Sequence, residues 1–344
     1  MIKSRISTYL LLLTALLVSV IAQETVRIRA VGDIMLESYH PEGFLRPEEK
    51  GSILQYIRPL LVDADITLGN LEGTLCDSGE TTKCEPDSID CYVFRMPEYG
   101  GGDLKASGFD FLSLANNHVG DFGLDCIDRT EFILDSLDIG WSGEPGSFAV
   151  KQVGNIQVAF VAFHSGGYTN SSLDTLNAQT IVRELSEEYE IVLVSLHGGA
   201  EGLAAMTLPD SMEYYMGEPR GHLRRFAHLM IDAGADLIVG HGPHVARAME
   251  MYKGRLIAYS LANFATYGRF NLQADRRFGC ILEVELSDQG DLKSAWIIAT
   301  EQKYWGVPFW DPNRRFVHLV DSLSQADLPG VGARFSPSGK LILN

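Results

Sequence analysis

Short apolar runs alternate with amphipathic segments along most of the chain. An apolar run bounded by turn residues predicts a buried strand, whereas apolar residues spaced three or four apart predict a helix. The predicted strands cover 26–31, 65–70, 109–115, 190–196 and 235–240. The predicted helices cover 52–61, 97–106, 123–138 and 222–234. This alternation is typical of an α/β protein, in which helices cover the faces of a sheet.

Two of the predicted helices show a particularly clear apolar face. The face of 52–61 consists of Ile53, Leu54, Ile57, Leu60 and Leu61. The stripe of 123–138 consists of Leu124, Ile127, Leu134 and Leu137. Gly140 follows this second helix as a stop signal. Both faces are expected to pack against a sheet, because an amphipathic helix must bury its apolar side.

Three further segments are typical of β-hairpins. They cover 148–163, 249–260 and 280–300, and Gly154-Asn155 and Lys253-Gly254 are the turn signals of the first two. No repeat, low-complexity run or linker separates the predicted elements. We therefore expect residues 23–344 to form one α/β domain with a mixed sheet, or with two sheets, covered by helices.

The N-terminal segment has the three parts of a secretory signal peptide. Lys3 and Arg5 precede an apolar run from Tyr9 to Ile21, which ends in a small residue suited to cleavage. This run is shorter than the ~20 residues needed to span a bilayer. We expect residues 1–22 to be a signal peptide and the rest to be extracytoplasmic: secreted, periplasmic or in the cell envelope. An uncleaved membrane anchor is the alternative.

The five cysteines are too few for a scaffold built on disulfides, but export would allow individual disulfides to persist. Cys76, Cys84 and Cys91 share one polar segment, where a zinc site would lack a histidine and a fourth ligand. A local disulfide between Cys84 and Cys91 is the favoured interpretation. Cys126 and Cys280 are expected to be buried as small apolar side chains. The odd number leaves at least one thiol free.

The composition limits the classes of partner. The chain has 344 residues, of which 45 are acidic and 28 basic, and its formal charge is −17. Such an acidic surface repels phosphate backbones, so a general nucleic-acid binder is excluded. A hydrophobic fraction of 46% excludes a disordered chain. An anionic partner must therefore be captured by a local site, in which metal ions or a few arginines reverse the field.

Polar side chains of metal-binding or acid–base type follow five of the predicted strands. Ligand sites in α/β proteins lie at the carboxyl ends of strands, where loops converge. Carboxylates, amides and imidazoles gathered there suit one or two divalent metal ions. The residues are Asp33, Asn70, Glu72, Asn116, Asn117, His118, His197, His241 and His244. Each alone has a structural explanation, such as a turn or a buried histidine, but repetition after five strands favours a site.

The remaining histidines carry weaker signals. His164 also follows a predicted strand, and it suits a place in the site and a structural role equally well. His222 and His228 are predicted to lie on the solvent or packing faces of the helix over 222–234.

The motifs occur in the order GDIM, GNLEGTL, SLANNHVGDFG, SLHGGAE, VGHGPHV and YSLANF. Together they resemble the capsule-synthesis protein CapA family, of the poly-γ-glutamate biosynthesis type, over about residues 26–265. That family is similar to the calcineurin-like metallophosphoesterases. The resemblance implies a four-layer α/β/β/α sandwich, in which two mixed sheets lie face to face and the site lies at one rim.

The resemblance also implies a metal centre with one or two divalent ions, of Mn, Fe or Zn. Its ligands would be Asp33, Glu72, Asn117, His197, His241 and His244. Asp33 would bind the first metal and Asn117 the second. Glu72 stands where the wider superfamily has an aspartate that bridges the two.

The remaining site residues would act on the substrate. His118 would be the general acid, and we expect Asp121, three residues later, to orient its imidazole. Arginines suit an anionic substrate because of their fixed charge and planar donors. The residues expected to contact the substrate are Asn70, Asn116, Arg95, Asn263 and Arg269, with Arg276 as an alternative to Arg269.

Four positions depart from the superfamily pattern. Met35 replaces the usual histidine of the first motif, and Glu72 replaces an aspartate. Gly198 follows His197 where an aromatic residue is usual, and Ala262 replaces the glycine before the last asparagine. The first metal position therefore has fewer strong ligands than usual.

The resemblance implies an exported protein of capsule or poly-γ-glutamate-type polymer biosynthesis. Its activity would be hydrolysis of a phosphoester or a γ-glutamyl amide by water that the metal activates. One alternative is a non-catalytic envelope protein that binds or guides an anionic polymer, and another is a surface protein with a vestigial site. The expected partners are an anionic polymer or phosphoester and membrane-associated capsule machinery, but no nucleic acid.

Overall fold

The computed structural model describes residues 24–343 apart from 41–42, 82, 85–90 and 269. The predicted signal peptide over 1–22 and the candidate substrate residue Arg269 lie outside the described residues. None of the helices in the described part of the chain is long and apolar enough to cross a membrane.

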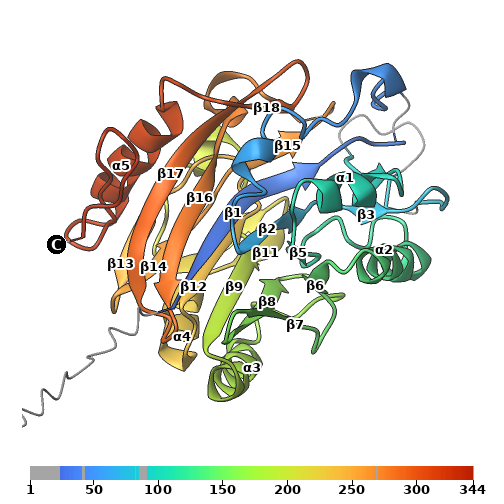
Figure 1. The fold of residues 1–344 in the computed structure, drawn as a ribbon. Helices are drawn as coiled ribbons and strands as arrows, with labels where there is room; N and C mark the ends of the chain where they lie inside the picture. The colour runs from blue at the N-terminus through green and yellow to red at the C-terminus, as the bar shows by residue number, and fades with distance from the viewer. Residues whose placement is uncertain (1–23, 41–42, 82, 85–90, 269, 344) are drawn as a thin grey trace, which may run out of the picture.

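An eight-stranded mixed sheet forms the first half of the fold (Figure 1). Its order is β18-β17-β16-β1-β2-β5-β6, and β15 also pairs with β1. The central strand β1 runs parallel to β2 and β15 and antiparallel to β16. The strands are β1(Thr25–Met35), β2(Ile66–Leu71), β5(Phe111–Ser113), β6(Gly140–Ser142), β15(Asn263–Thr266), β16(Phe278–Ser287), β17(Leu292–Lys303) and β18(Val307–Trp310).

A six-stranded mixed sheet forms the second half, in the order β13-β14-β12-β9-β8-β7. Its strands are β7(Ala149–Val153), β8(Ile156–His164), β9(Ile191–His197), β12(Leu237–His241), β13(Met249–Tyr252) and β14(Arg255–Ala258). Strands β8, β9, β12 and β14 are parallel, so their carboxyl ends meet at one rim. Two small sheets pair β3(Thr74–Leu75) with β4(Arg95–Met96) and β10(Glu213–Tyr215) with β11(Glu218–Gly221).

Helices cover the outer faces of both sheets. They are α1(Gly100–Ala106), α2(Leu124–Ser136), α3(Thr175–Glu188), α4(Leu223–Ala233) and α5(Arg315–Asp327), and the 3-10 helices are η1(Glu48–Lys50), η2(Arg58–Leu60), η3(Leu203–Ala205) and η4(Ala274–Arg277). Apolar side chains of α1 and α2 pack on the larger sheet, and those of α3 and α4 pack on the smaller one.

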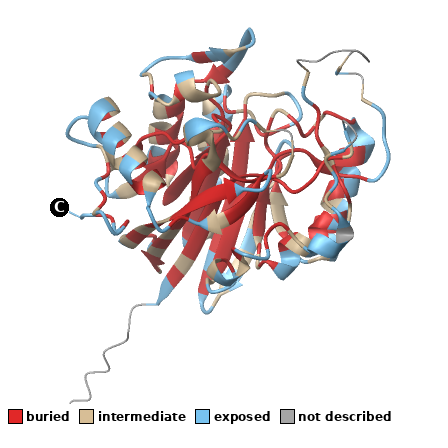
Figure 2. Cartoon of the chain, turned by 90° about the horizontal axis from the view of Figure 1, so that it is seen from above, coloured by how far each residue is buried: buried red, intermediate tan, exposed pale blue. Residues whose placement is uncertain are grey.

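The main core lies between the two sheets. It joins residues such as Ile28 and Phe111 of the larger sheet to Phe160 and Leu193 of the smaller one. Phe316 of α5 closes this core. Buried residues fill the strands, and the exposed residues lie mainly on the outer helices and loops (Figure 2). The predicted four-layer α/β/β/α arrangement with two mixed sheets is therefore confirmed.

Most predicted elements are present, but the helix over 52–61 is wrong. This segment forms turns and η2, because Pro59 lacks an N–H and disfavours helical backbone in the residue before it. Its apolar face is nevertheless buried, with Ile53, Leu54, Ile57 and Leu61 at most 1% exposed. In α2 the buried stripe is shifted, so that Leu124 is 60% exposed while Thr130 is buried. Helices α3 and α5 were not predicted.

The cysteine pairing differs in part from the expectation. Cys84 pairs with Cys91, as favoured by their spacing, and Cys280 is a buried free thiol. Cys126 is not a free apolar residue, because it forms a disulfide with Cys76 across 50 residues of sequence. This bond ties the loop after β3 to α2. Because Cys76, Cys84 and Cys91 all form disulfides, they cannot be the ligands of a zinc site.

Candidate functional site

The carboxyl ends of strands from both sheets converge at one rim. In the larger sheet, Asp33 of β1 lies opposite Asn70 of β2 and Asn263 of β15. In the smaller sheet, His197 of β9 lies opposite His241 of β12. Hydrogen bonds join the two sheets here, so the predicted gathering of strand-end side chains is present in the fold.

Three side chains at this rim form a metal-ligating group. One oxygen each of Asp33 and Glu72 and one nitrogen of His197 lie within 4.8 Å of one another. All three residues are fully buried. His197 Nε2 lies 3.2 Å from Glu72 Oε2. Burial raises the pKa of Glu72, but the charge and hydrogen bond of His197 outweigh it and lower the pKa. Glu72 is thus a carboxylate over the physiological range, as a metal ligand must be.

Two buried amides fix the positions of these carboxylates. Asn70 Nδ2 donates to Asp33 Oδ1 at 2.9 Å and also donates to Glu72 Oε2. Asn116 Nδ2 donates to Asn70 Oδ1 at 3.1 Å, and Asn116 Oδ1 accepts from the His118 N–H at 3.0 Å. Both asparagines were predicted to contact the substrate. In the structure their side-chain amides are hydrogen-bonded to other site residues. They fix the positions of the Asp33 and Glu72 carboxylates and of the His118 backbone.

His244 approaches the same cluster from the loop after β12. Its Nδ1 lies 2.8 Å from Asp33 Oδ2, and its Nε2 lies 3.9 Å from Glu201 Oε2. Burial lowers the pKa of His244, but the hydrogen bond and charge of Asp33 outweigh it and raise the pKa to about 9. The contact with Asp33 therefore favours the protonated form of His244. Glu201, in the motif SLHGGAE, was given no role by the sequence analysis.

The structure gives His241 a different environment from that of His197. Its Nε2 lies 3.0 Å from the Val31 carbonyl oxygen, and its Nδ1 lies 3.2 Å from Ser195 Oγ. Burial lowers the pKa of His241, so the ring is a neutral donor and acceptor. With both nitrogens hydrogen-bonded, it joins the two sheets in this arrangement and could ligate a metal only by giving up one bond.

His164 lies behind His197 rather than in the cluster. Its Nδ1 lies 3.0 Å from the His197 carbonyl oxygen, and the two rings meet edge to face at 5.0 Å. Burial, with the charge of His197, lowers the pKa of His164 to about 3. It is thus a neutral residue that orients His197, and the structure favours its supporting role.

Two further amide oxygens test whether a metal ion fits this rim. The Oδ1 atoms of Asn117 and Asn263 are buried and have no hydrogen-bond partner among the described residues. An unpaired buried acceptor is costly unless a ligand or water satisfies it. Asn263 lies opposite Asp33 in the sheet, and Asn117 precedes His118. Carboxylate, imidazole and amide donors at one rim are the set that a divalent ion requires, so the residues fit such an ion.

His118 is oriented by a carboxylate, as the spacing of the motif predicted. Its Nδ1 lies 2.7 Å from Asp121 Oδ2, which leaves Nε2 at 3.9 Å from Glu72 Oε1. Asp121 also accepts from the Phe94 N–H at 2.9 Å and from Lys83 Nζ at 2.5 Å. The ring of Phe94 packs on the imidazole at 4.2 Å. Phe94 and Lys83 are site residues that the sequence analysis missed, because none of the predicted strands ends near them.

The arginines predicted to hold a substrate are less directly placed. Arg95 lies in β4, where its guanidinium stacks over Tyr39 and Phe122 and donates to the Cys76 carbonyl oxygen. Arg276 is half-buried in η4, and its carbonyl oxygen accepts from Asn263 Nδ2 at 3.4 Å. Among the described residues, neither guanidinium contacts the carboxylate–histidine cluster.

A comparison with models of known families places this chain in one of them. The model of the bacterial capsule synthesis protein family PGA_cap matches residues 27–267. The chain belongs to this family. The family resemblance predicted from the motifs is therefore confirmed, and the match covers every strand-end residue of the cluster.

Curated relatives of this PGA_cap member include two capsule proteins of Bacillus. The PGA biosynthesis protein CapA of Bacillus subtilis (strain 168) is 30% identical over 253 residues, covering 68% of this chain and 61% of that protein. The capsule biosynthesis protein CapA of Bacillus anthracis is 25% identical over 262 residues, covering 70% and 60%. The chain thus aligns with about three fifths of the length of these relatives.

Solved structures similar to this PGA_cap member include two nucleotidases. A 5′-nucleotidase precursor from Thermus thermophilus has a TM-score of 0.41 and 14% identity, covering 80% of this chain and 54% of that chain. The NAD nucleotidase of Haemophilus influenzae also has a TM-score of 0.41, with 11% identity over 87% and 56% of the two chains.

The departures of this PGA_cap member from the superfamily pattern have structural counterparts. Met35 is fully buried in the apolar core on the helix side of the larger sheet, so it is not a replacement ligand. Ala262 adopts a left-handed backbone with φ 61°, the conformation for which glycine is the favoured residue. Its carbonyl oxygen accepts from the Asp33 N–H at 2.9 Å and so fixes the backbone of the first ligand.

Close backbone approach explains the glycine of the first motif. A Cβ at Gly32 would lie 1.8 Å from the Ala262 carbonyl oxygen, a backbone atom that cannot rotate away as a flexible side chain could. Gly32→Ala is expected to reduce the free energy of unfolding by about 1–3 kcal/mol, the usual cost of overpacking. The control is Gly102→Ala in α1, where a Cβ has nothing within 4 Å and helix propensity favours alanine. Urea unfolding measures both, and equal stabilities would contradict the proposed close approach.

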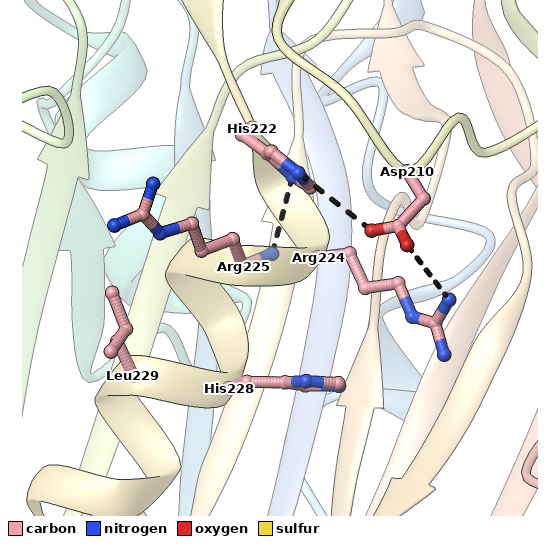
Figure 3. A pocket seen from close by; sticks show the side chains of 6 residues that line it. All are labelled: Asp210, His222, Arg224, Arg225, His228 and Leu229. Carbon is pink, nitrogen blue, oxygen red and sulfur yellow. Dashed lines mark hydrogen bonds and ion pairs between the residues drawn. The ribbon is translucent and has the colours of Figure 1, made fainter.

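A second group of ionisable residues surrounds a cavity of about 420 Å³ at α4 (Figure 3). The lining residues are Asp210, His222, Arg224, Arg225, His228 and Leu229. Asp210 lies 3.7 Å from both His222 and Arg224, and His228 lies 3.0 Å from the buried Glu250. His222 Nδ1 also accepts from the Arg225 N–H and caps α4. Asp210, His222, Arg224 and His228 thus each have a partner within the protein, which agrees with the packing role considered for His222 and His228.

Proposed function

We propose that this PGA_cap protein is an exported, metal-dependent hydrolase of capsule or poly-γ-glutamate-type polymer biosynthesis. The observation that carries the proposal is the buried Asp33–Glu72–His197 group, with His118 facing Glu72 at 3.9 Å. A metal-ligating group beside an oriented acid is the arrangement that hydrolysis of a phosphoester or a γ-glutamyl amide requires. The family membership supports the polymer as the biological context.

A divalent ion held by Asp33, Glu72 and His197, with the unpaired amide oxygen of Asn117 as a further candidate ligand, would supply a Lewis acid and an acidified water near neutral pH. The chain's own residues would then position the carboxylates and protonate the leaving group. Asn70 keeps both carboxylates aimed at the rim. Asp121 holds the proton on His118 Nδ1 and stabilises the imidazolium, so that Nε2 can give its proton to the leaving group.

Export is part of the proposal. The basic residues and apolar run of 1–22 support it, and so do the two disulfides, because disulfides persist in oxidising compartments. A protein located there would act on polymer outside the cytoplasm, beside membrane-associated capsule machinery. Sequencing the N-terminus of the protein recovered from the culture medium or envelope tests this part, and an intact residue 1–22 segment would contradict cleavage.

The alternative function is binding or guiding an anionic polymer without turnover. Two observations favour it: Met35 lies in the apolar core where the superfamily has a ligand, and both nitrogens of His241 are engaged by the protein. Such a protein would bind polymer with or without a chelator. The hydrolase, in contrast, loses its activity when the metal is removed.

One experiment separates the two functions. The secreted chain is purified, its metal content is measured by elemental analysis, and nitrophenyl phosphates and poly-γ-glutamate are assayed with and without chelator. We expect Mn, Fe or Zn at one or two ions per chain, and turnover that the chelator abolishes and added metal restores. Metal-free protein that stays inactive after reconstitution, yet binds polymer, would establish the binding function instead.

A further inference from the structure

A groove of about 870 Å³ lies beside the candidate metal centre, next to the ring of His244. Its lining includes Phe270, Arg277, Gln302, Lys303, Tyr304 and Trp305. Phe270 connects the groove to the site, because its ring lies 5.0 Å from that of His244 and 5.1 Å from that of Phe94. Phe94 in turn packs on His118. A substrate longer than one unit would therefore extend from the reacting bond along this groove.

The turn between β17 and β18 forms the outer wall of the groove with two aromatic residues. Tyr304 and Trp305 are 75% and 66% exposed. Both have a left-handed backbone, with φ 47° and 72°, which costs a non-glycine residue about 1 kcal/mol or more. The ring of Tyr304 meets that of Phe309 edge to face at 5.8 Å, but most of the surface of both Tyr304 and Trp305 faces solvent. Their placement is explained if the rings contact a ligand.

The polar groups of the groove are mainly donors. Gln302 Oε1 accepts from the Thr266 N–H at 2.8 Å, which fixes the amide orientation, and its buried Nε2 has no acceptor among the described residues. Lys303 and Arg277 lie 3.3 Å and 4.0 Å from Glu301, a carboxylate that Arg315 already binds at 2.8 Å. On a chain with a charge of −17, this groove presents an excess of donors and positive charge.

We propose that this groove is a subsite for an extended acidic polyamide, whose carboxylates and carbonyls pair with its donors. The aromatic rings and Phe270 would cover the methylene stems between those groups, because such stems are the apolar part of the ligand. A neutral glycan fits less well, because it carries no negative charge to pair with Lys303 and Arg277. Among the described residues that line the groove, Glu301 is the only carboxylate, and Arg315 already binds it. The proposal rests on the proposed function in taking the polymer as the substrate.

Binding to a His118→Asn background tests the groove without turnover. The probe is a linear γ-linked glutamate octamer at low salt, and its Kd is measured by calorimetry on the full secreted chain. We expect Trp305→Ala and Lys303→Gln each to raise the Kd about ten-fold. Trp310→Ala is the matched control, because Trp310 is 53% exposed on the same hairpin but does not line the groove. It should change the Kd less than two-fold.

Several outcomes would overturn the proposal that this groove binds an acidic polyamide. Among them are an octamer that does not bind, a Kd unaffected by both groove substitutions, and a neutral glucan hexamer that binds in its place with dependence on Trp305. Lys303→Gln guards against misfolding as the cause, because Lys303 is 45% exposed and its removal leaves the core intact. If the octamer binds in a manner that depends on Trp305 but the unsubstituted protein shows no hydrolytic turnover, the groove proposal stands and only the proposed hydrolase activity is rejected.

Discussion

Replacing His118 with asparagine is expected to lower turnover by about 10²- to 10⁴-fold, the contribution of a general acid. The reason is geometric. Asp121 holds Nδ1 at 2.7 Å, so that only Nε2 can face the substrate beside Glu72. The effect should grow with the basicity of the leaving group. A nitrophenolate leaves with little help, whereas an alkoxide or an amide nitrogen requires the proton.

Turnover of a nitrophenyl phosphate and of an alkyl phosphate or γ-glutamyl amide measures this dependence. The control is His318→Asn, which changes an exposed histidine of α5 and should leave turnover unchanged. Thermal unfolding of both variants checks that the fold survives. Equal losses for good and poor leaving groups would show that His118 binds the substrate rather than protonating it, and an unchanged turnover would remove it from the mechanism.

Replacing Glu72 with glutamine is expected to weaken metal binding by at least about 100-fold. Loss of a residue that merely supports a ligand costs about 10- to 100-fold in affinity, and Glu72 is placed as a ligand itself. The substitution preserves shape, and the glutamine carbonyl can still accept from Asn70. The change therefore removes the negative charge beside Asp33 and His197 and converts one of the two acceptor oxygens into an amide donor.

Elemental analysis and calorimetric titration with Mn²⁺ or Zn²⁺ measure this effect independently of activity. Glu250→Gln is the matched control, because Glu250 is an equally buried glutamate that binds His228 and Tyr259 outside the cluster. It should retain the metal content of the unsubstituted protein. If Glu72→Gln also retained full metal content, the Asp33–Glu72–His197 group would not be the metal site.

The sequence predicted the strand ends well because their signals are local. Apolar runs that stop at Asp33, His197 or His241 mark both the strand and the point where a polar side chain emerges. Parallel strands then bring these residues to one rim whatever the connecting loops do. The Cys84–Cys91 pairing is likewise close in sequence, whereas Cys76 and Cys126 meet only through the packing of α2 on the loop after β3.

Met35 shows why the site could not be completed from the sequence. In a regular strand, residues two apart share a face, so Met35 would lie beside Asp33. The pairing of β1 with β15 shifts register between Asp33 and Ile34, and Met35 turns into the core on the helix side. A strand irregularity of this kind depends on the partner strand, which no local pattern reports.

The sequence by itself determined the α/β class, the family and the set of residues that gather at the rim. Their roles were decided by the tertiary structure. The side-chain amides of Asn70 and Asn116 are hydrogen-bonded to other site residues, and both ring nitrogens of His241 are hydrogen-bonded. Each of these contacts comes from a different strand. The groove beside Trp305 likewise exists only once the end of β17 and the turn after it are placed against η4. Side-chain type follows from local sequence, but hydrogen-bond partners follow from elements that are distant in it.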